Sequence, residues 1–250
     1  MVLDWHIARN ERGHFTSGPA ILVLDILRGH NRVSAYVAKT LAKAGIHGFV
    51  LHMPQDGWRC TAGKPHDWRA FLPSLRQAAA DARRCRDVIA ALPLVKGPIG
   101  IQGTSLGGFV ATLSSAIDDA FDVTLLTLAG GNTFDVLSHG KMDAARVRRR
   151  LHEAGYDDDS LRRWLWNIEP LRVAHRLDPS RTWLYSARFD QVVSRANSDK
   201  LAAAIGLDRE HHRRIFGCHY TSVLFAPRFL ADFVRIIRQR TPGGYTSAAS

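Results

Sequence analysis

Residues 101–110 read IQGTSLGGFV and place Ser105 between Gly103 and Gly107. The apolar, β-branched run just before this serine, GPIGIQG, is typical of a buried strand, and the run that begins with it, SLGGFVATLSSAI, is typical of a helix. Ser105 therefore lies at a predicted strand-to-helix junction. Glycine patterns this short are common by chance, so the role of the serine has to be judged from the rest of the chain.

A serine at a sharp strand-to-helix turn can act as a nucleophile. The residues two positions before and after it must be small, and Gly103 and Gly107 satisfy this. The turn raises the hydroxyl above the sheet edge and puts the N–H of Leu106 at a helix N-terminus, where it can stabilise a developing negative charge. The alternative is that Ser105 only caps the helix, since serine is favoured there. The junction favours the nucleophile.

Strands and helices alternate on both sides of this junction. Apolar runs predict strands at 20–26, 48–53, 97–103, 121–130, 181–187 and 211–217. Helical spacing predicts helices at 31–45, 72–92, 105–117 and 222–240, the last one bent or broken at Pro227. This alternation predicts an α/β fold with a mostly parallel, doubly wound sheet and helices on both faces.

Residues 131–179 interrupt the alternation, because they contain three helical pieces and no convincing strand. We expect this insertion to form a helical cap at the edge of the sheet where chemistry collects; an ornamental surface insertion is the alternative. Its Trp164 and Trp166 are expected to contact substrate. Residues 1–240 are predicted to form one domain, and 241–250 a flexible tail.

A serine hydroxyl is a weak nucleophile unless a base takes its proton, and that base needs an orienting acceptor. In a parallel sheet, residues that follow the strands gather at one edge. Asp190 follows the fifth predicted strand and His219 follows the sixth, so both are expected beside Ser105. The order Ser, Asp, His is the order this architecture uses. Asp135, after the fourth strand, is the alternative acid.

Neither the other histidines nor the cysteines predict a metal site, and no cofactor is expected. No H-E-x-x-H spacing occurs. The adjacent His211 and His212 would point to opposite faces of a strand, which makes them a poor chelating pair. His52 follows a strand and is the other histidine that could line the pocket. The three cysteines are widely spaced, which favours reduced thiols.

The chain of 250 residues carries a formal charge of +11. A nucleic-acid partner would require basic residues gathered with aromatic ones on one face, whereas the arginines here are spread along the chain, so none is expected. No run approaches the roughly 18–20 apolar residues of a membrane span. Residues 1–15 carry early charges and lack the apolar core of a secretory signal, so a cytoplasmic location is expected.

These residues resemble the α/β-hydrolase superfamily over 20–240. Residues 167–193, NIEPLRVAHRLDPSRTWLYSARFDQVV, are similar to the approach to the acid-bearing strand in its dienelactone-hydrolase and prolyl-oligopeptidase-like branches. The resemblance implies that Ser105 is the nucleophile, His219 the general base and then the general acid, and Asp190 the residue that orients the imidazole.

The resemblance also implies two backbone donors to an oxyanion, the N–H of Leu106 and the N–H of Leu27. At the second donor, Asp25-Ile26-Leu27 stands where the family often has His-Gly. Because the donor is a backbone group, side-chain identity does not decide whether it is present. Asp25 adds a carboxylate at this point, and we expect it to contact substrate.

The sequence thus predicts a serine hydrolase that cleaves a small-molecule carboxylic ester through an acyl-enzyme intermediate. The arginine-rich insertion and its two tryptophans favour a moderately polar or anionic substrate. The alternative is a hydrolase-like fold with little activity that serves as a binding or interaction module, since a fold does not fix a function.

Overall fold

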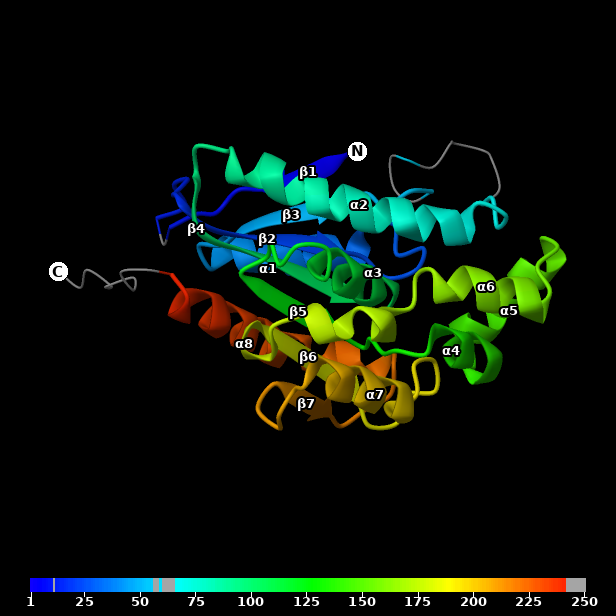
Figure 1. Cartoon of the computed structure of the whole chain (residues 1–250). Coiled ribbons are helices and arrows are strands. Elements are labelled where there is room, and N and C mark those ends of the chain that lie inside the picture. Colours follow the sequence, from blue (N-terminus) through cyan, green and yellow to red (C-terminus); the bar gives the residue numbers. More distant parts are fainter. Residues whose placement is uncertain (11, 56–58, 60–65, 242–250) are drawn as a thin grey trace.

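In a computed structural model, the chain is described over residues 1–241, except for 11, 56–58 and 60–65 (Figure 1). The described residues form a seven-stranded sheet with the order β1-β3-β2-β4-β5-β6-β7. Its strands are β1 (Leu3–His6), β2 (Gly18–Leu24), β3 (His47–Leu51), β4 (Val95–Thr104), β5 (Val123–Thr127), β6 (Thr182–Ala187) and β7 (His212–Ile215). Residues 242–250 of the predicted tail lie outside the described residues.

All neighbouring strands pair in parallel, apart from the antiparallel edge strand β1. Strands β2, β5 and β6 are buried along their whole length, which explains why their sequences are mainly apolar, carry no charged residue and do not alternate with exposed polar positions. The predicted α/β architecture is confirmed. Because the strands are parallel, the loops that follow them emerge at one common edge.

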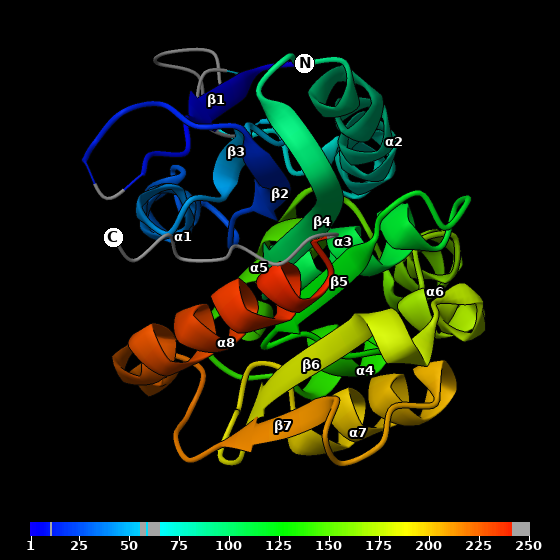
Figure 2. The ribbon, with the colours of Figure 1, turned by 90° about the vertical axis from the view of Figure 1, so that its left-hand side faces the viewer.

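Helices cover both faces of the sheet (Figure 2). On one face α1 (Arg32–Lys43) and α8 (Ala226–Gln239) pack together; on the other lie α2 (Phe71–Ala90), α3 (Leu106–Ser115) and α7 (Arg195–Ile205). Strand β2 contributes side chains to the cores on both faces of the sheet. Ile21 faces α1 and α8, whereas Leu22 faces α2 and α3. Each such side chain, fully buried, contributes about 1.5–3 kcal/mol. No helix in the described ranges is both long and apolar enough to cross a membrane.

The insertion between β5 and β6 contains α4 (Thr133–His139), α5 (Asp143–Glu153) and α6 (Asp158–Trp166), followed by three single 3-10 turns. The sequence prediction missed α4. The start of this short helix is stabilised by a residue far along the chain. The side chain of Glu169 accepts hydrogen bonds from the backbone N–H groups of Asn132 and Thr133. Asp135 therefore lies in a helix and not in a loop.

The last helix begins later than predicted. Residues Thr221–Phe225 form a 3-10 turn, and α8 starts at Ala226. Pro227 lies in the first turn of α8. Backbone N–H groups in the first turn of a helix make no intrahelical hydrogen bond, so the lack of an N–H in proline costs nothing there. Pro227 therefore marks the start of the helix and does not bend its interior.

His47, at the start of β3, is a fully buried histidine held in its neutral form. Its Nδ1 accepts hydrogen bonds from the indole N–H of Trp5 (3.2 Å) and the backbone N–H of Ala8 (3.0 Å). Its Nε2 donates to the carbonyl of Leu94 at 3.0 Å. Burial lowers the pKa of His47, because the charged imidazolium would lose its hydration.

This buried histidine predicts a loss of stability in acid. The folded-state pKa lies below the unfolded value of about 6.5, so its contribution is complete above about pH 6.5 and is lost as the pH falls below it, at up to about 1.4 kcal/mol per pH unit. The variant His47→Gln should be less stable at neutral pH and should show a shallower decline in acid. Urea unfolding across this range tests the prediction, and equal slopes in the two proteins would contradict it.

Candidate active site

The turn between β4 and α3 holds Ser105 in an unusual backbone conformation. Its φ is 52° and its ψ is −115°, a region that side-chain-bearing residues seldom occupy. The backbone N–H of Ser105 donates to the carbonyl of Thr127 on the neighbouring strand at 2.8 Å. Strain of this kind persists only where the surrounding structure enforces it.

The two flanking glycines explain how the turn is enforced. A Cβ on Gly103 would lie 2.1 Å from the carbonyl oxygen of Gly107, and a Cβ on Gly107 would lie 2.4 Å from the carbonyl oxygen of Leu24. All these obstructing atoms are backbone, so no side-chain rotation relieves the clash. The start of α3 thus packs directly on the ends of β4 and β2, and any larger residue would push it away.

Ser105, His219 and Asp190 come together at this edge. The hydroxyl oxygen of Ser105 lies 3.0 Å from Nε2 of His219, and Nδ1 of His219 lies 2.7 Å from Oδ2 of Asp190. The other carboxylate oxygen of Asp190 accepts hydrogen bonds from the backbone N–H groups of Val192 (2.8 Å) and Val193 (3.0 Å). Nδ1 therefore donates to the carboxylate, and Nε2 is left as the acceptor facing the serine hydroxyl.

The loops that carry Asp190 and His219 are joined by the backbone. The N–H of Phe189 donates to the carbonyl of Gly217, and the N–H of Arg188 donates to that of Ile215, each at 2.9 Å. These bonds extend the pairing of β6 and β7 past the sheet edge. The side chain of Asp190 is 2% exposed and that of His219 10%, so their hydrogen bond is largely shielded from water.

The alternative residues raised by the sequence lie elsewhere. Asp135 pairs with His139 at 2.9 Å and accepts from the side-chain amide of Asn197 at 3.0 Å. His52 is buried, with Nδ1 2.9 Å from the amide of Asn31 and Nε2 2.9 Å from Asp4. His52 is not among the described residues that line the cavity at Ser105.

The two residues whose backbone amides are expected to face an oxyanion lie at the cavity beside Ser105. Leu27 and Leu106 both line the same cavity as Ser105. Within the described chain, no oxygen accepts a hydrogen bond from either N–H. Amides in this position are available to a ligand.

Asp25 does not have the predicted role. Its side chain is fully buried and is not among the described cavity-lining residues. Its Oδ1 accepts hydrogen bonds from the backbone N–H groups of Ile26 (2.9 Å) and Ser34 (3.2 Å). The carboxylate thus shapes the loop after β2 from inside, and the expected contact of Asp25 with substrate is wrong.

Ser105 and His219 open on a cavity of about 470 Å³. Its wall is overwhelmingly apolar and comes from α1, α2, α3, α8 and the insertion. The insertion contributes Val136, Leu137, Ala144, Val147, Leu165 and Ile168. Such a cavity favours an apolar group, and Arg32 is the one Arg or Lys side chain among its described lining residues.

The tryptophans of the insertion lie outside this cavity, contrary to expectation. Trp166 is 60% exposed and stacks under the guanidinium of Arg172, whose carbon lies 4.5 Å from the ring centroid. Trp164 is half-buried against the core. Leu165 in α6 and Ile168 in the turn that follows it, three positions apart, line the cavity instead. That spacing was present in the sequence and could have identified them.

Gln102 adds one polar group to the cavity that the sequence analysis overlooked. On β4 it pairs with Val23 and Leu125, which places it on the face covered by α1 and α8. Its side-chain N–H donates to the hydroxyl of Thr104 at 2.9 Å. Its buried Oε1 has no hydrogen-bond partner among the described residues.

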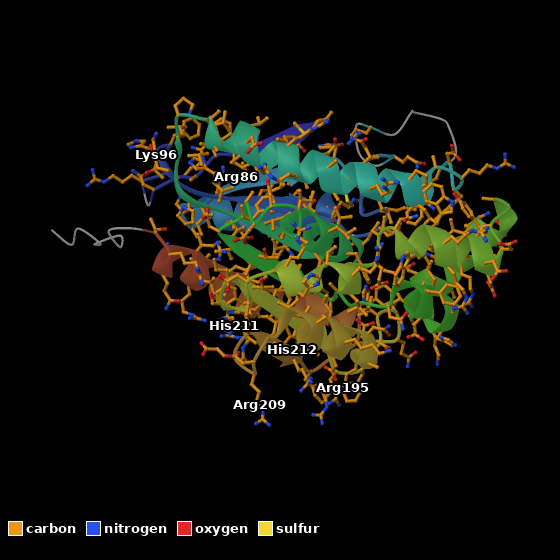
Figure 3. All side chains as sticks on the ribbon, viewed as in Figure 1. Arg86, Lys96, Arg195, Arg209, His211 and His212 are labelled. Carbon is orange, nitrogen blue, oxygen red and sulfur yellow. The ribbon has the colours of Figure 1, made fainter. Side chains whose placement is uncertain are left out.

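A second grouping of the same three residue types lacks these features. His212 Nε2 lies 2.8 Å from the hydroxyl of Ser186, but its Nδ1 is 3.9 Å from Asp199, too far for a hydrogen bond. Ser186 is buried within β6 and is not at a turn. His211 immediately precedes β7 and His212 opens it (Figure 3). Burial lowers the pKa of His212, as expected for a packed, neutral side chain.

The described residues contain no group of three or more His, Cys, Asp or Glu side chains placed to hold a metal ion. Burial raises the pKa of Cys85 to about 12, so this thiol is neutral at physiological pH. Cys60 lies outside the described residues.

Comparison with solved structures identifies the fold. No family model matches the sequence, and no curated protein matches it. Among solved structures, TT1662 from Thermus thermophilus is similar at 18% identity and a TM-score of 0.65, over 89% of this chain and 90% of that one. A cold-adapted esterase from an Arctic intertidal metagenomic library is similar at 20% identity and a TM-score of 0.59, over 90% of this chain and 84% of that one.

Acylaminoacyl peptidase from Pyrococcus horikoshii is similar at 12% identity and a TM-score of 0.70, over 96% of this chain but only 39% of the peptidase. At identities this low, the similarity concerns the fold. The chain has the α/β-hydrolase fold, as the resemblance in its sequence implied.

The packing at the turn makes a prediction about stability. Gly107→Ala should cost more than about 3 kcal/mol, because its Cβ would collide with backbone that has to move. Gly206→Ala is the control, since Gly206 has a φ of 87° and open space around it, and should cost only about 1 kcal/mol of conformational strain. Urea unfolding measures both, and equal losses would show that the close approach is not the constraint.

Proposed function

We propose that this chain is a serine hydrolase that cleaves carboxylic esters of small molecules bearing an apolar group. The observation that carries the proposal is the 3.0 Å contact between the Ser105 hydroxyl and Nε2 of His219, made on a strained turn beside an apolar cavity. Structural neighbours with this fold include an esterase and a peptidase, which supports hydrolytic chemistry.

In the first half of the reaction, His219 takes the hydroxyl proton as Ser105 Oγ attacks the ester carbonyl carbon. The carbonyl oxygen becomes an oxyanion, which the N–H groups of Leu106 and Leu27 stabilise; each such donor contributes roughly 10²–10³-fold to the rate. Asp190 stabilises the imidazolium through Nδ1. His219 then protonates the departing alcohol, which leaves an acyl group on Ser105.

In the second half, a water molecule takes the place of the alcohol. His219 removes its proton, and the resulting hydroxide attacks the acyl carbon of the ester on Ser105. The same two amides stabilise the second oxyanion. His219 finally returns the proton to Ser105 Oγ as the carboxylic acid leaves. Because Asp190 is fixed by two backbone N–H groups, the imidazole keeps one orientation throughout.

The lining of the cavity favours an ester over a peptide. A buried peptide N–H without an acceptor costs about 1–3 kcal/mol, whereas an ester has no such donor to satisfy. Among the described cavity-lining residues, polar side chains are few compared with aliphatic and aromatic ones. Ester substrates with apolar chains therefore fit this site better than peptides do.

We further propose that residues 1–240 act as one hydrolase domain and that 131–179 form its cap. Side chains from α4, α5 and α6 supply one wall of the cavity. The insertion is also tied to the catalytic loop, since the hydroxyl of Tyr220 donates to Asp143 Oδ2 at 2.7 Å. Substrate selection is then a property of the insertion, and bond cleavage a property of the sheet edge.

The alternative of an inactive binding module was suggested by the carboxylate of Asp25 beside the expected oxyanion site. That carboxylate is buried, its Oδ1 accepts hydrogen bonds from two backbone N–H groups, and it is not among the described residues that line the cavity.

Replacement of the serine tests the proposal directly. Ser105→Ala should reduce the hydrolysis of p-nitrophenyl esters by at least about 10³-fold, because no nucleophile remains. Ser186→Ala is the matched control: its serine also contacts a histidine, but it should keep the wild-type kcat. Circular dichroism checks that both variants fold. Undiminished turnover by Ser105→Ala would exclude the mechanism.

The cavity wall predicts chain-length selectivity. Val147→Trp fills the insertion side of the cavity, so the ratio of kcat/KM for p-nitrophenyl octanoate to that for the acetate should fall by about tenfold or more. Trp166→Ala, outside the cavity, should leave this ratio unchanged. A ratio that does not respond to Val147→Trp would place the substrate chain elsewhere.

A further inference from the structure

Large apolar side chains that reach solvent are concentrated around the opening of the cavity. Seven of the twelve such side chains in the described part of the chain belong to this group. We call it the opening patch; it consists of Tyr36, Met142, Phe189, Phe216, Tyr220, Val223 and Leu224. Single exposed apolar residues are normal, but a contiguous group marks an interaction site.

The patch is continuous with the cavity. Tyr36, Tyr220 and Val223 are exposed and also line the cavity, so they lie where it meets solvent. The most exposed members are Leu224 (76%) and Phe216 (68%). In Figure 2 the loops after β6 and β7 lie side by side, and Phe189 from the first meets Phe216 from the second edge to face, with ring centroids 5.3 Å apart.

Exposed cations accompany these apolar residues. They are Arg28, Arg32, Lys141, Arg188 and Arg228, all exposed. No described carboxylate lies within ion-pair distance of any of them, so their charge is not offset locally by a described side chain. The carboxylates that do lie nearby are engaged, Asp190 by His219 and Asp143 by Tyr220 and Arg146.

We propose that the opening patch docks on an anionic lipid surface. Exposed aromatic and aliphatic side chains flanked by these cations match the two layers of such a surface, with acyl chains below anionic headgroups. A second protein seated on the patch would close the cavity, whereas a fluid lipid layer leaves it open and supplies apolar molecules to it. Docking does not depend on catalysis and goes beyond the proposed hydrolysis.

The test is vesicle flotation with the full-length Ser105→Ala protein, so that hydrolysis does not alter the lipid. The protein should float with vesicles of phosphatidylcholine and phosphatidylglycerol at low salt. It should bind phosphatidylcholine alone more weakly by about tenfold or more, since each basic residue near an anionic surface contributes about 1 kcal/mol, or about fivefold. Added salt should weaken the binding to the anionic vesicles.

Matched variants locate the contact. In the Ser105→Ala background, Phe216→Ser with Leu224→Ser should weaken anionic-vesicle binding by about tenfold or more, because less apolar area is inserted. Val88→Ser with Ile117→Ser removes exposed apolar residues elsewhere and should have no effect.

The charge contribution is tested in the same way. Arg188→Gln with Arg228→Gln should weaken binding by about tenfold or more. Arg209→Gln is the control, since Arg209 extends into solvent from the turn before β7, at the other end of that strand from His219 (Figure 3).

Two results would overturn the proposal. One is the absence of flotation with anionic vesicles, or flotation that patch and control variants share equally. The other is a dimer in sedimentation velocity that Phe216→Ser with Leu224→Ser dissociates, which would make a second copy of the chain the occupant of the patch.

Discussion

The close approach of backbone to backbone at Gly103, Gly107 and Leu24 is the constraint on which the site depends. It brings the first turn of α3 directly against the ends of β4 and β2, and this contact holds Ser105 at a positive φ. The same contact brings the N–H of Leu106 beside the loop that carries the N–H of Leu27. One packing requirement therefore positions Ser105, the proposed nucleophile, and places the N–H of Leu106 near the loop that carries Leu27.

The rest of the site follows from parallel pairing. Strands β4, β6 and β7 all end at one edge, so residues that are 114 positions apart in the chain, Ser105 and His219, meet at 3.0 Å. Backbone hydrogen bonds between the two later loops and onto Asp190 then hold the imidazole in place, and the insertion adds the hydrogen bond from Tyr220 to Asp143. The sheet edge carries Ser105, His219 and Asp190, while helices on both faces and the insertion supply the apolar wall of the cavity beside them.

The sequence predicted the fold and the meeting of Ser105, Asp190 and His219 because both depend on strand order and on residues directly after strands. Features set by tertiary packing were harder to predict. Asp25 turns inward because two backbone N–H groups need an acceptor, which no linear pattern shows. The size of Trp164 and Trp166 does not show which way they point; Leu165 in α6 and Ile168 in the turn after it line the cavity. Helix α4 could not be predicted from its own residues, because the backbone N–H groups at its start donate to Glu169, more than thirty residues away.

The central claim is that Ser105 is activated by His219. Labelling with a fluorophosphonate tests it most directly, because the reagent reacts only with a serine whose hydroxyl proton is removed and whose oxyanion is stabilised. Intact-protein mass and peptide mapping should show one adduct per chain, on Ser105, and no adduct in a folded His219→Ala variant. A folded wild-type protein that is not labelled, or is labelled at another residue, would contradict the account.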